Sequence, residues 1–458
     1  MMERLFGTDG IRGIANRHPM TPQTGLRLGR ALVQFLRKGN VMALIGRDTR
    51  LSGPMLEYAL ASGLMSEGAQ VGAAGVLPTP AVACLTKELG ADVGIVVSAS
   101  HNPFDHNGFK VFSSEGTKLR EQEEQEIEEI ILSLDPESGV EEVGSIKQIE
   151  KGVETYIEFL VGQFPNLPDL GSLGIVIDCA NGATYRTAPC LFEKLNTKFM
   201  ALGVAPDGKN INEGCGSQHP ESLVKKVIET GAVAGLAFDG DGDRLVAVDE
   251  KGHILTGDQL LVIFAKMLKD QGRLKGNLVI STVMSNIGLR IALESMGIDH
   301  VATAVGDRNV YQEMVGRGAV LGGEESGHII FLQYHSTGDG MLSALQLLNA
   351  MKYFDRPLSE LGELMEVFPQ VLINVPVTRK PPLSELPAVQ RVIKDVQNRL
   401  GNWGRVLVRY SGTESLCRVM VEGQHQDEVE NYAREIASAV AENLGRESYS
   451  NSSDSSLG

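Results

Sequence analysis

Residues 93–104, VGIVVSASHNPF, place an apolar run directly before a turn of small, polar and imidazole side chains. A buried strand that brings polar side chains to its carboxyl end is how α/β folds build ligand sites. Alone, Ser100 and Asn102 would more often form a local turn that bonds only nearby backbone. We place Ser100 at the centre of the chemistry because three further polar motifs follow it: DGDGDR at 239–244, GGEESGH at 322–328 and RYSGTESLCR at 409–418.

The DGDGDR motif alternates aspartate with glycine, so an extended loop would project Asp239, Asp241 and Asp243 to one side. Three converging carboxylates suit a hard divalent cation such as Mg²⁺. A calcium EF-hand loop is the competing interpretation, because Glu250 stands where that loop needs its bidentate glutamate. However, Arg244 occupies the position that needs glycine, and the flanking residues resemble strands. We therefore predict a catalytic metal.

The RYSGTESLCR motif combines planar guanidinium donors with a tight turn. Arg409 and Arg418 offer donor forks. Ser411, Gly412 and Thr413 add hydroxyl and backbone donors between them. The motif predicts a phosphate-binding segment, although in isolation it would be an ordinary hairpin with two surface arginines.

The GGEESGH motif presents Glu324 and Ser326, a carboxylate and a hydroxyl that suit a ligand with a diol or an amine. His328 follows them, beside the apolar residues IIF. A lone histidine in that setting is more often a core residue, so its predicted substrate role depends on the other motifs.

Basic residues near these motifs are further candidates. Arg12 in FGTDGIRG could contact phosphate, and Arg308 in VGDRNV and Arg244 could orient substrate. His101 and Lys110 are the nearest proton carriers, and the sequence does not choose between them. Two arginines after the strand at 41–46 could meet an anion or solvent, and we expect Arg50 to lie in solvent.

The chain alternates strand and helix patterns three times, which predicts three similarly built α/β domains. We place the first domain at 1–150 and the second at 151–254. The first contains the serine loop around Ser100, and the second contains the metal loop DGDGDR. We place the third at 255–369, where GGEESGH is the predicted sugar loop. Residues 370–446 resemble a smaller α+β domain, and the polar tail at 447–458 should be disordered. We expect mixed sheets and a central cleft. The acidic helix pattern at 120–134 should have a solvated glutamate face.

Charge and cysteine use restrict the function classes. The 458 residues carry a formal net charge of −16, which argues against nucleic acid or an anionic membrane as the main partner. An anionic small-molecule substrate must then meet locally placed Arg and Lys. The five cysteines lack metal-ligand spacing, and there is no membrane-length apolar run or signal-peptide core. We expect reduced thiols and a cytoplasmic protein.

The four motifs, together with GTDGIRG at 7–13 and VGDRNV at 305–310, resemble the phosphohexomutase superfamily and, within it, the bacterial phosphoglucosamine mutases. The resemblance implies that Ser100 is a phosphoserine whose phosphate joins the three aspartates around one Mg²⁺. It implies that the enzyme interconverts glucosamine 6-phosphate and glucosamine 1-phosphate through a 1,6-bisphosphate intermediate. The bisphosphate would also act as an activator, and the product would supply the synthesis of UDP-N-acetylglucosamine. It further implies a distal phosphate site at 409–418 and a homodimer.

The sequence departs from the usual pattern of these mutases at four positions: His106, Asn309, Glu325 and Ser415. Glu325 lies in the sugar loop, so the choice of hexose stays open, although an added carboxylate would suit a protonated amine. One alternative is a phosphomannomutase/phosphoglucomutase with the same residues in the same roles. Another is a non-catalytic, calcium-stabilised sugar-phosphate binding protein.

Overall fold

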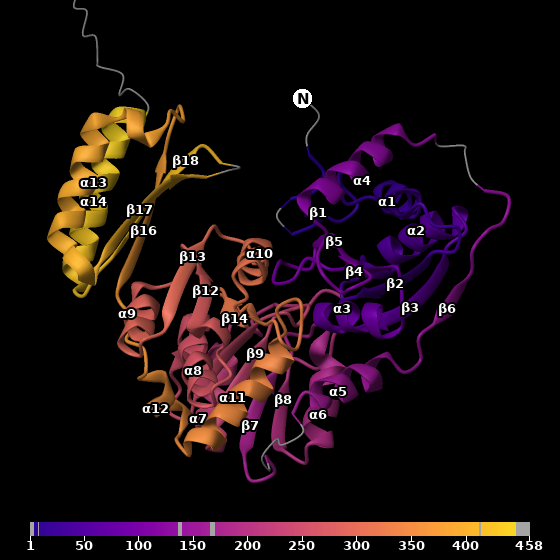
Figure 1. Ribbon diagram of the computed structural model, residues 1–458, viewed down its shortest axis with the longest axis horizontal. Helices are drawn as coiled ribbons and strands as arrows, with labels where there is room; N and C mark the ends of the chain where they lie inside the picture. The colour runs from indigo at the N-terminus through magenta and orange to yellow at the C-terminus, as the bar shows by residue number, and fades with distance from the viewer. Residues whose placement is uncertain (1–3, 8, 136–139, 165–169, 412–413, 446–458) are drawn as a thin grey trace, which may run out of the picture. The chain divides into compact units, whose positions relative to one another are not determined.

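The computed structural model describes residues 4–7, 9–135, 140–164, 170–411 and 414–445 (Figure 1). Two compact units divide the chain, one within 1–285 and 293–364 and the other within 286–292 and 365–458. The first contains three mixed β-sheets with helices, and the second contains a small antiparallel sheet. The predicted fold class, three similarly built α/β domains and a smaller C-terminal α+β domain, is confirmed.

The first sheet has the strand order β1-β5-β4-β2-β3-β6. Its strands are β1 (Ile11–Ile14), β2 (Met42–Arg47), β3 (Gln70–Val76), β4 (Val93–Val97), β5 (His106–Ser113) and β6 (Ile146–Gln148). The neighbours among β2, β3, β4 and β6 are parallel, whereas β5 returns antiparallel to β4 and pairs with β1. All five residues of β4 are buried, as its unbroken apolar sequence predicts.

The helices of this first domain are α1 (Pro22–Leu36), α2 (Gly53–Ser66), α3 (Thr79–Glu88) and α4 (Glu121–Ser133). Helix α1 begins with Thr21 as N-cap and Pro22 in its first turn, a favoured start. One expectation is wrong here: Arg50, expected in solvent, is completely buried. The solvated glutamate face of α4 is seen at Glu121, Glu126 and Glu129, which are exposed, whereas Glu124 is buried against Arg308.

The second sheet has the order β11-β10-β9-β7-β8. It comprises β7 (Gly174–Asp178), β8 (Lys198–Leu202), β9 (Ala234–Phe238), β10 (Leu245–Asp249) and β11 (Ile254–Leu255), with helices α5 (Gly152–Gly162), α6 (Thr184–Lys194) and α7 (Glu221–Thr230). Strand β9 is parallel to β7 and antiparallel to β10. The DGDGDR motif is therefore the loop that reverses the chain between β9 and β10.

The third sheet has the order β13-β12-β14-β15. Its elements are β12 (Leu278–Thr282), β13 (Asp299–Thr303), β14 (Leu321–Gly323), β15 (Ile329–Phe331), α8 (Gly257–Asp270), α9 (Ile287–Ser295), α10 (Asp307–Arg317), α11 (Gly340–Phe354) and α12 (Leu358–Gly362), with the short 3-10 turn η1 (Lys275–Asn277). Thr256 and Gln259 form a capping box at the start of α8. The GGEESGH motif joins β14 to β15.

The second unit has the strand order β16-β18-β17, all antiparallel. It consists of β16 (Gln370–Pro376), β17 (Arg405–Tyr410), β18 (Leu416–Glu422), α13 (Pro387–Leu400) and α14 (Gln426–Leu444), with 3-10 turns η2 (Leu383–Glu385) and η3 (Gly401–Trp403). One apolar cluster joins the helices to the sheet, including Val396, Val419 and Ile436. The predicted tail at 447–458 lies outside the described residues.

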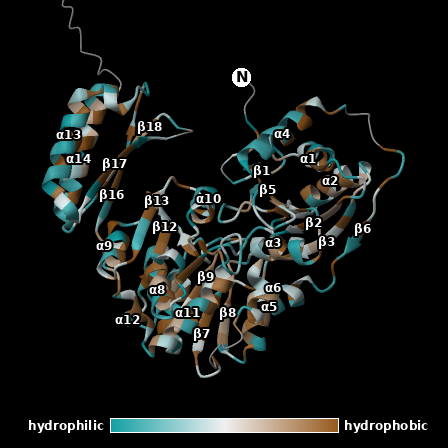
Figure 2. Ribbon diagram, viewed as in Figure 1, coloured by the Kyte–Doolittle hydropathy of each residue, from teal (hydrophilic) through white to brown (hydrophobic). Residues whose placement is uncertain are grey.

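Hydropathy follows this layered arrangement. Figure 2 shows hydrophobic colouring on central strands such as β7 and β9, whereas α13 is largely hydrophilic. Every residue but one of the apolar helix segment 260–268 in α8 is buried. Within the described part of the chain, no helix combines the length and apolar character needed to cross a membrane.

Candidate active site

The serine loop begins where β4 ends. Ser100 is 1% exposed and has a left-handed φ of 52°. Its backbone N–H donates to Ser98 Oγ at 3.0 Å, and Ser98 Oγ donates to Asp48 Oδ2 at 2.5 Å. A non-glycine residue persists in this region of backbone space only where its surroundings hold it there. The end of β4 therefore presents Ser100 in one fixed orientation.

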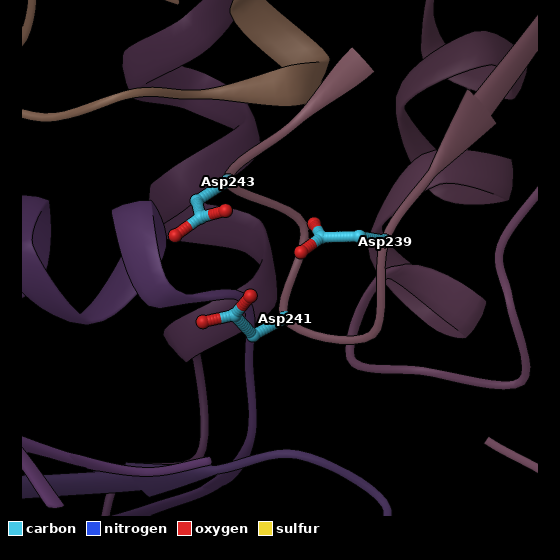
Figure 3. A group of neighbouring side chains, drawn as sticks. All are labelled: Asp239, Asp241 and Asp243. Atoms are coloured by element: carbon cyan, nitrogen blue, oxygen red, sulfur yellow. The ribbon is translucent and has the colours of Figure 1, made fainter. Parts of the chain in front are cut away.

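The aspartate loop carries Asp239, Asp241 and Asp243, whose side chains point toward one another in Figure 3. All three are buried, and one carboxylate oxygen from each lies within 4.8 Å of the others. The Oδ1 atoms of Asp241 and Asp243 are buried without a hydrogen-bond partner. Buried acceptors are normally satisfied. This arrangement of carboxylates therefore fits a hard divalent cation.

Ser100 adjoins this cluster. Its Oγ donates to Asp239 Oδ2 at 2.6 Å. The two loops meet because β4 and β9, although they belong to different sheets, end at the same place in the first unit. The structure thus brings together the serine and the aspartates that the sequence places in separate motifs.

The EF-hand alternative finds no support in the structure. Glu250 follows β10, and its carboxylate accepts hydrogen bonds from the backbone N–H of Ser359 at 3.2 Å and from the Ser359 hydroxyl. The loop also lies between two strands, whereas an EF-hand loop joins two helices. The glutamate spacing in the sequence is a coincidence.

Lys110 supplies the counter-charge of the aspartate loop. Strand β5 runs antiparallel to β4, and the Lys110 Nζ lies 2.7 Å from Asp241 Oδ2 and 3.0 Å from Asp243 Oδ2. Burial lowers the pKa of Lys110, but Asp241, Asp243 and Asp9 outweigh that effect and hold the pKa well above its usual value. Lys110 is therefore an ammonium group, directed toward the site as the sequence predicts.

The acidic groups respond unequally to this environment. Burial and repulsion from Asp243 and Asp241 raise the pKa of Asp239 well above its usual range. Burial also acts to raise the pKa of Asp243, but Lys110 and His328 outweigh it and hold that pKa well below the usual range. An added cation would therefore offset the repulsion that disfavours ionised Asp239.

The sequence interpretation missed three residues of the site: Asp9, Lys118 and Asp307. Lys118 forms ion pairs with both Asp9 and Asp307. His328 continues the network, with Nε2 3.6 Å from Asp307 Oδ2 and Nδ1 3.6 Å from Asp243 Oδ1. Asp9 and Asp307 lie inside GTDGIRG and VGDRNV, where the adjacent arginines drew attention instead. Lys118 stands in no motif.

A cavity of about 610 Å³ opens beside Asp243. Five predicted site residues line it: Asp243 itself, Arg12, Arg244, Glu324 and His328. Glu324 Oε1 accepts a hydrogen bond from the backbone N–H of Gly306 at 3.1 Å, which fixes the carboxylate at the wall. The volume of the cavity suits a small ligand, and the guanidinium and carboxylate groups that line it suit a phosphorylated sugar.

His101 lies next to the nucleophile candidate, with Nδ1 3.4 Å from Ser100 Oγ. Burial, together with Arg244 and Arg12, lowers the pKa of His101 to about 4. The imidazole is therefore neutral near pH 7. A neutral imidazole can accept a proton in the reaction, whereas Lys110 is already protonated.

Comparisons with known proteins agree with this geometry. Models of the phosphoglucomutase/phosphomannomutase family match most of the chain: alpha/beta/alpha domain I at 3–138, domain II at 154–252, domain III at 256–368 and the C-terminal domain at 372–439. The phosphoglucosamine mutase of Syntrophus aciditrophicus is 52% identical over 449 residues, which covers 97% of this chain and 100% of that protein.

The chain belongs to the phosphoglucosamine mutase family. It is therefore an enzyme of the phosphoglucomutase/phosphomannomutase superfamily.

Solved structures of other mutases share the fold of this chain. A phosphoglucomutase/phosphomannomutase family protein from Burkholderia thailandensis has a TM-score of 0.78 at 26% identity, covering 96% of this chain and 98% of that one. The Aspergillus fumigatus N-acetylphosphoglucosamine mutase, described in complex with GlcNAc-6P and magnesium, has a TM-score of 0.67 at 16% identity, covering 96% and 95%.

Two residues that the sequence assigns to substrate binding in the first unit lie apart from the lining of the 610 Å³ cavity. Arg308 forms a two-point ion pair with Glu124, its Nη1 at 2.9 Å from Oε2, and lines a separate cavity of about 250 Å³. The Oγ of Ser326 is buried and has no hydrogen-bond partner. Among the described residues, neither belongs to the lining of the larger cavity.

The predicted phosphate-binding segment, residues 409–418, lies in the second unit. Arg409 and Arg418 are directly opposite each other on β17 and β18, and like charges in that position destabilise a sheet. The backbone N–H of Ser411 donates to Leu416 O at 2.9 Å, and Lys380 Nζ donates to Ser411 O at 2.7 Å. Glu414 already pairs with Arg418, its Oε2 lying 3.1 Å from Nη2, and a bound anion would offset the remaining charge. Predicted residues Gly412 and Thr413 lie outside the described residues.

Proposed function

We propose that this enzyme interconverts glucosamine 6-phosphate and glucosamine 1-phosphate, with Ser100 as the carrier of the phosphoryl group. The observation that carries the proposal is the 2.6 Å contact between Ser100 Oγ and Asp239 in the buried aspartate cluster. A hydroxyl beside a cation site is suited to accept and return a phosphoryl group. The family relationship, at 52% identity to a phosphoglucosamine mutase, indicates the class of sugar.

The proposal places one Mg²⁺ among Asp239, Asp241 and Asp243, with an oxygen of phosphorylated Ser100 as a further ligand. The Oδ1 atoms of Asp241 and Asp243, buried without a hydrogen bond among the described residues, support this donor set, although His328 Nδ1 lies 3.6 Å from that of Asp243. The Aspergillus enzyme, whose structure is described as a complex with magnesium, supports the choice of ion. When bound, the ion would neutralise charge on the transferring phosphoryl group.

In the first half-reaction, the bond between phosphorus and Ser100 Oγ breaks while a bond forms to the free hydroxyl oxygen of the substrate. The proton of that hydroxyl passes to a base, for which neutral His101 is the candidate. Lys110, held as an ammonium group, is suited to stabilise the charge that develops on Ser100 Oγ. The product is a 1,6-bisphosphate. It turns around in the site and returns its other phosphoryl group to Ser100.

The proposal assigns substrate contacts to residues of each unit separately. In the first unit, the sugar is bound and oriented by Arg12, Arg244, Arg308, Glu324, Ser326 and His328. In the second, the phosphate that is not reacting is bound by Arg409, Ser411, Gly412, Thr413 and Arg418. The opposed arginines of β17 and β18 support the second assignment because they concentrate positive charge at one place.

Coupled assays on the phosphates of glucosamine, glucose and mannose, with Mg²⁺ and with or without a hexose 1,6-bisphosphate, test the substrate. We expect a strong preference for glucosamine phosphates and activation by the bisphosphate. A preference for a neutral hexose would instead assign the chain a phosphomannomutase/phosphoglucomutase activity. The comparison also tests Glu325, whose carboxylate would favour the substrate amine.

Other features of the proposal follow from the family relationship. We propose a homodimer, which light scattering of the purified enzyme would test. We also propose that the enzyme works in the cytoplasm and supplies UDP-N-acetylglucosamine synthesis. The four-domain division at residues 150, 254 and 369 stays a prediction, and limited proteolysis would test it.

A further inference from the structure

Arg50 uses every hydrogen-bond donor of its guanidinium group, and all but one go to the serine loop. Its side chain is completely buried, and Nε donates to Asp48 Oδ2 at 2.8 Å. Its terminal nitrogens donate to four backbone carbonyl oxygens, those of Ser100 at 2.9 Å, Asn102 at 2.8 Å, His106 at 3.0 Å and Pro103. Arginine has five N–H donors in a planar fork, and lysine has three on one atom. No other side chain could make this set of bonds.

Asn212 holds the same loop from the second domain. It lies between β8 and α7, is 8% exposed, and its Nδ2 donates to Ser100 O at 3.0 Å and to Asn102 O at 3.1 Å. Its own backbone is anchored, because its N–H donates to Ala180 O at 2.9 Å. The serine loop is therefore tied to the domain that carries the aspartates.

Together these contacts determine the backbone torsions of Ser100. The carbonyl oxygen of Ser100 accepts from Arg50 and Asn212, which fixes the peptide plane after the residue. The N–H of Ser100 donates to Ser98 Oγ, which fixes the plane before it. With both planes held, the residue stays at its left-handed φ of 52°. That backbone sets the direction of the Cα–Cβ bond, and from there Oγ reaches Asp239 Oδ2 at 2.6 Å.

The aspartate loop packs directly on the same contact. A Cβ atom on Gly240 would lie 2.5 Å from Ser100 O and 2.7 Å from Asn212 Nδ2. Glycine is therefore required there for the two loops to approach. The carbonyl of Ser100 lies where Arg50, Asn212 and the aspartate loop meet.

We propose that Arg50 and Asn212 are positioning residues that set the torsions of Ser100 and so aim its Oγ at Asp239. This inference rests on the proposed function, in which Ser100 carries the phosphoryl group. Neither residue touches substrate in this account. Their loss should lower kcat and leave KM unchanged, because a small misplacement of a reacting atom can cost about a hundredfold in rate.

The test uses Asn212→Asp in the full-length enzyme. Aspartate keeps the shape and tolerates a positive φ, but it points an acceptor at the two carbonyl oxygens. Asn196→Asp is the matched control, because Asn196 also has a left-handed φ, of 51°, and is exposed away from the loop. We expect kcat to fall about a hundredfold at unchanged KM in Asn212→Asp alone.

Amide hydrogen exchange of residues 98–106 in the free enzyme provides a readout that is independent of turnover. Asn212→Asp should accelerate exchange there and leave the rest of the first domain unchanged. Arg50→Lys, which keeps the charge beside Asp48 but loses the fork, should show the same pattern, and it decides the question if Asn212→Asp does not fold.

The proposal is overturned if kcat and local exchange match wild type, or if KM rises and exchange accelerates throughout the domain. If wild type itself lacks mutase activity, the proposed function fails, while the exchange data still show whether these residues hold the loop.

Discussion

Ser100 and Asp239 share a 2.6 Å hydrogen bond although they are 139 residues apart in the chain. Each follows the buried central strand of its own sheet, β4 or β9. The contact places a hydroxyl against three buried carboxylates, and its geometry is the basis of the predictions below.

Thr79, which belongs to the first domain, should raise the affinity of the metal site for Mg²⁺. Its N–H donates to Asp241 O at 2.8 Å, and its hydroxyl donates to Asp241 Oδ2. Thr79→Val removes the second bond at constant shape, so we expect Mg²⁺ to bind about 10–100-fold more weakly. Calorimetric titration of the metal-free enzyme measures this affinity. The control is Thr86→Val, a buried threonine of the same helix that bonds only to Val82 O. Equal affinity in both variants would contradict the prediction.

Lys110 should stabilise the metal-free enzyme. Lys110→Met leaves Asp241 and Asp243 without their buried cation, which should cost about 3–5 kcal/mol of unfolding free energy. Mg²⁺ should restore more stability to this variant than to wild type, because it supplies the missing charge. Denaturant unfolding with and without Mg²⁺ measures both effects.

The exposed pair of Lys87 and Glu115 offers a control for this measurement. Lys87→Met should change little in either condition, since exposed ion pairs contribute little. A loss in Lys110→Met that Mg²⁺ does not reduce would argue against the assignment of the aspartates as metal ligands.

The second unit should determine how well substrate binds. Arg418→Ala removes one of the two opposed guanidinium groups, and we expect KM to rise about tenfold, the equivalent of about 1.4 kcal/mol. Phosphorylation of Ser100 by a hexose 1,6-bisphosphate at saturating concentration should remain. Arg434→Ala, which breaks only an exposed helix pair with Glu430, is the control. Unchanged KM in Arg418→Ala would remove this segment from the substrate site.

Stability should depend on pH through His335. Burial lowers the pKa of His335 to about 4 from its ordinary value of 6.5, and its Nε2–H donates to Pro80 O at 2.9 Å. The unfolded chain therefore binds this proton first as the pH falls. His335 therefore contributes about 3 kcal/mol to the free energy of unfolding above pH 6.5. This contribution is lost as the pH falls from about 6.5 to 4, and the free energy changes no further through His335 below that.

His335→Gln, which keeps a donor for Pro80 O, should have a smaller loss of stability across this pH window. Unfolding measured at several pH values for wild type, His335→Gln and the exposed-site variant His219→Gln checks the difference. Parallel curves for all three would show that His335 does not have the shifted pKa.

Local sequence patterns predicted much of the fold and the centre of the site. The apolar run in β4 and the alternating glycines around Asp241 have consequences within a few residues, and both are seen in the structure. Lys110 was also predictable, because a return strand after the serine loop has to bring it back beside the loop.

Residues that act over long sequence distances were not predictable. Arg50 appeared suited to solvent because nothing in its own segment indicates that the carbonyl oxygens of a loop 50 residues away surround it. The ion pair of Lys118 with Asp307 depends on packing between two domains, and its pair with Asp9 joins residues 109 positions apart. Glu250 illustrates the opposite error, in which a matching spacing had no structural counterpart.

The most direct test is the phosphoryl group on Ser100 itself. Intact-mass analysis of enzyme treated with a hexose 1,6-bisphosphate should show one added phosphoryl group, which is still present after turnover with glucosamine 6-phosphate because each cycle returns a phosphoryl group to Ser100. Ser100→Ala should show neither the added mass nor mutase turnover, and Ser62→Ala, an exposed helix serine, should behave as wild type. Mutase turnover that survives in Ser100→Ala would contradict the account.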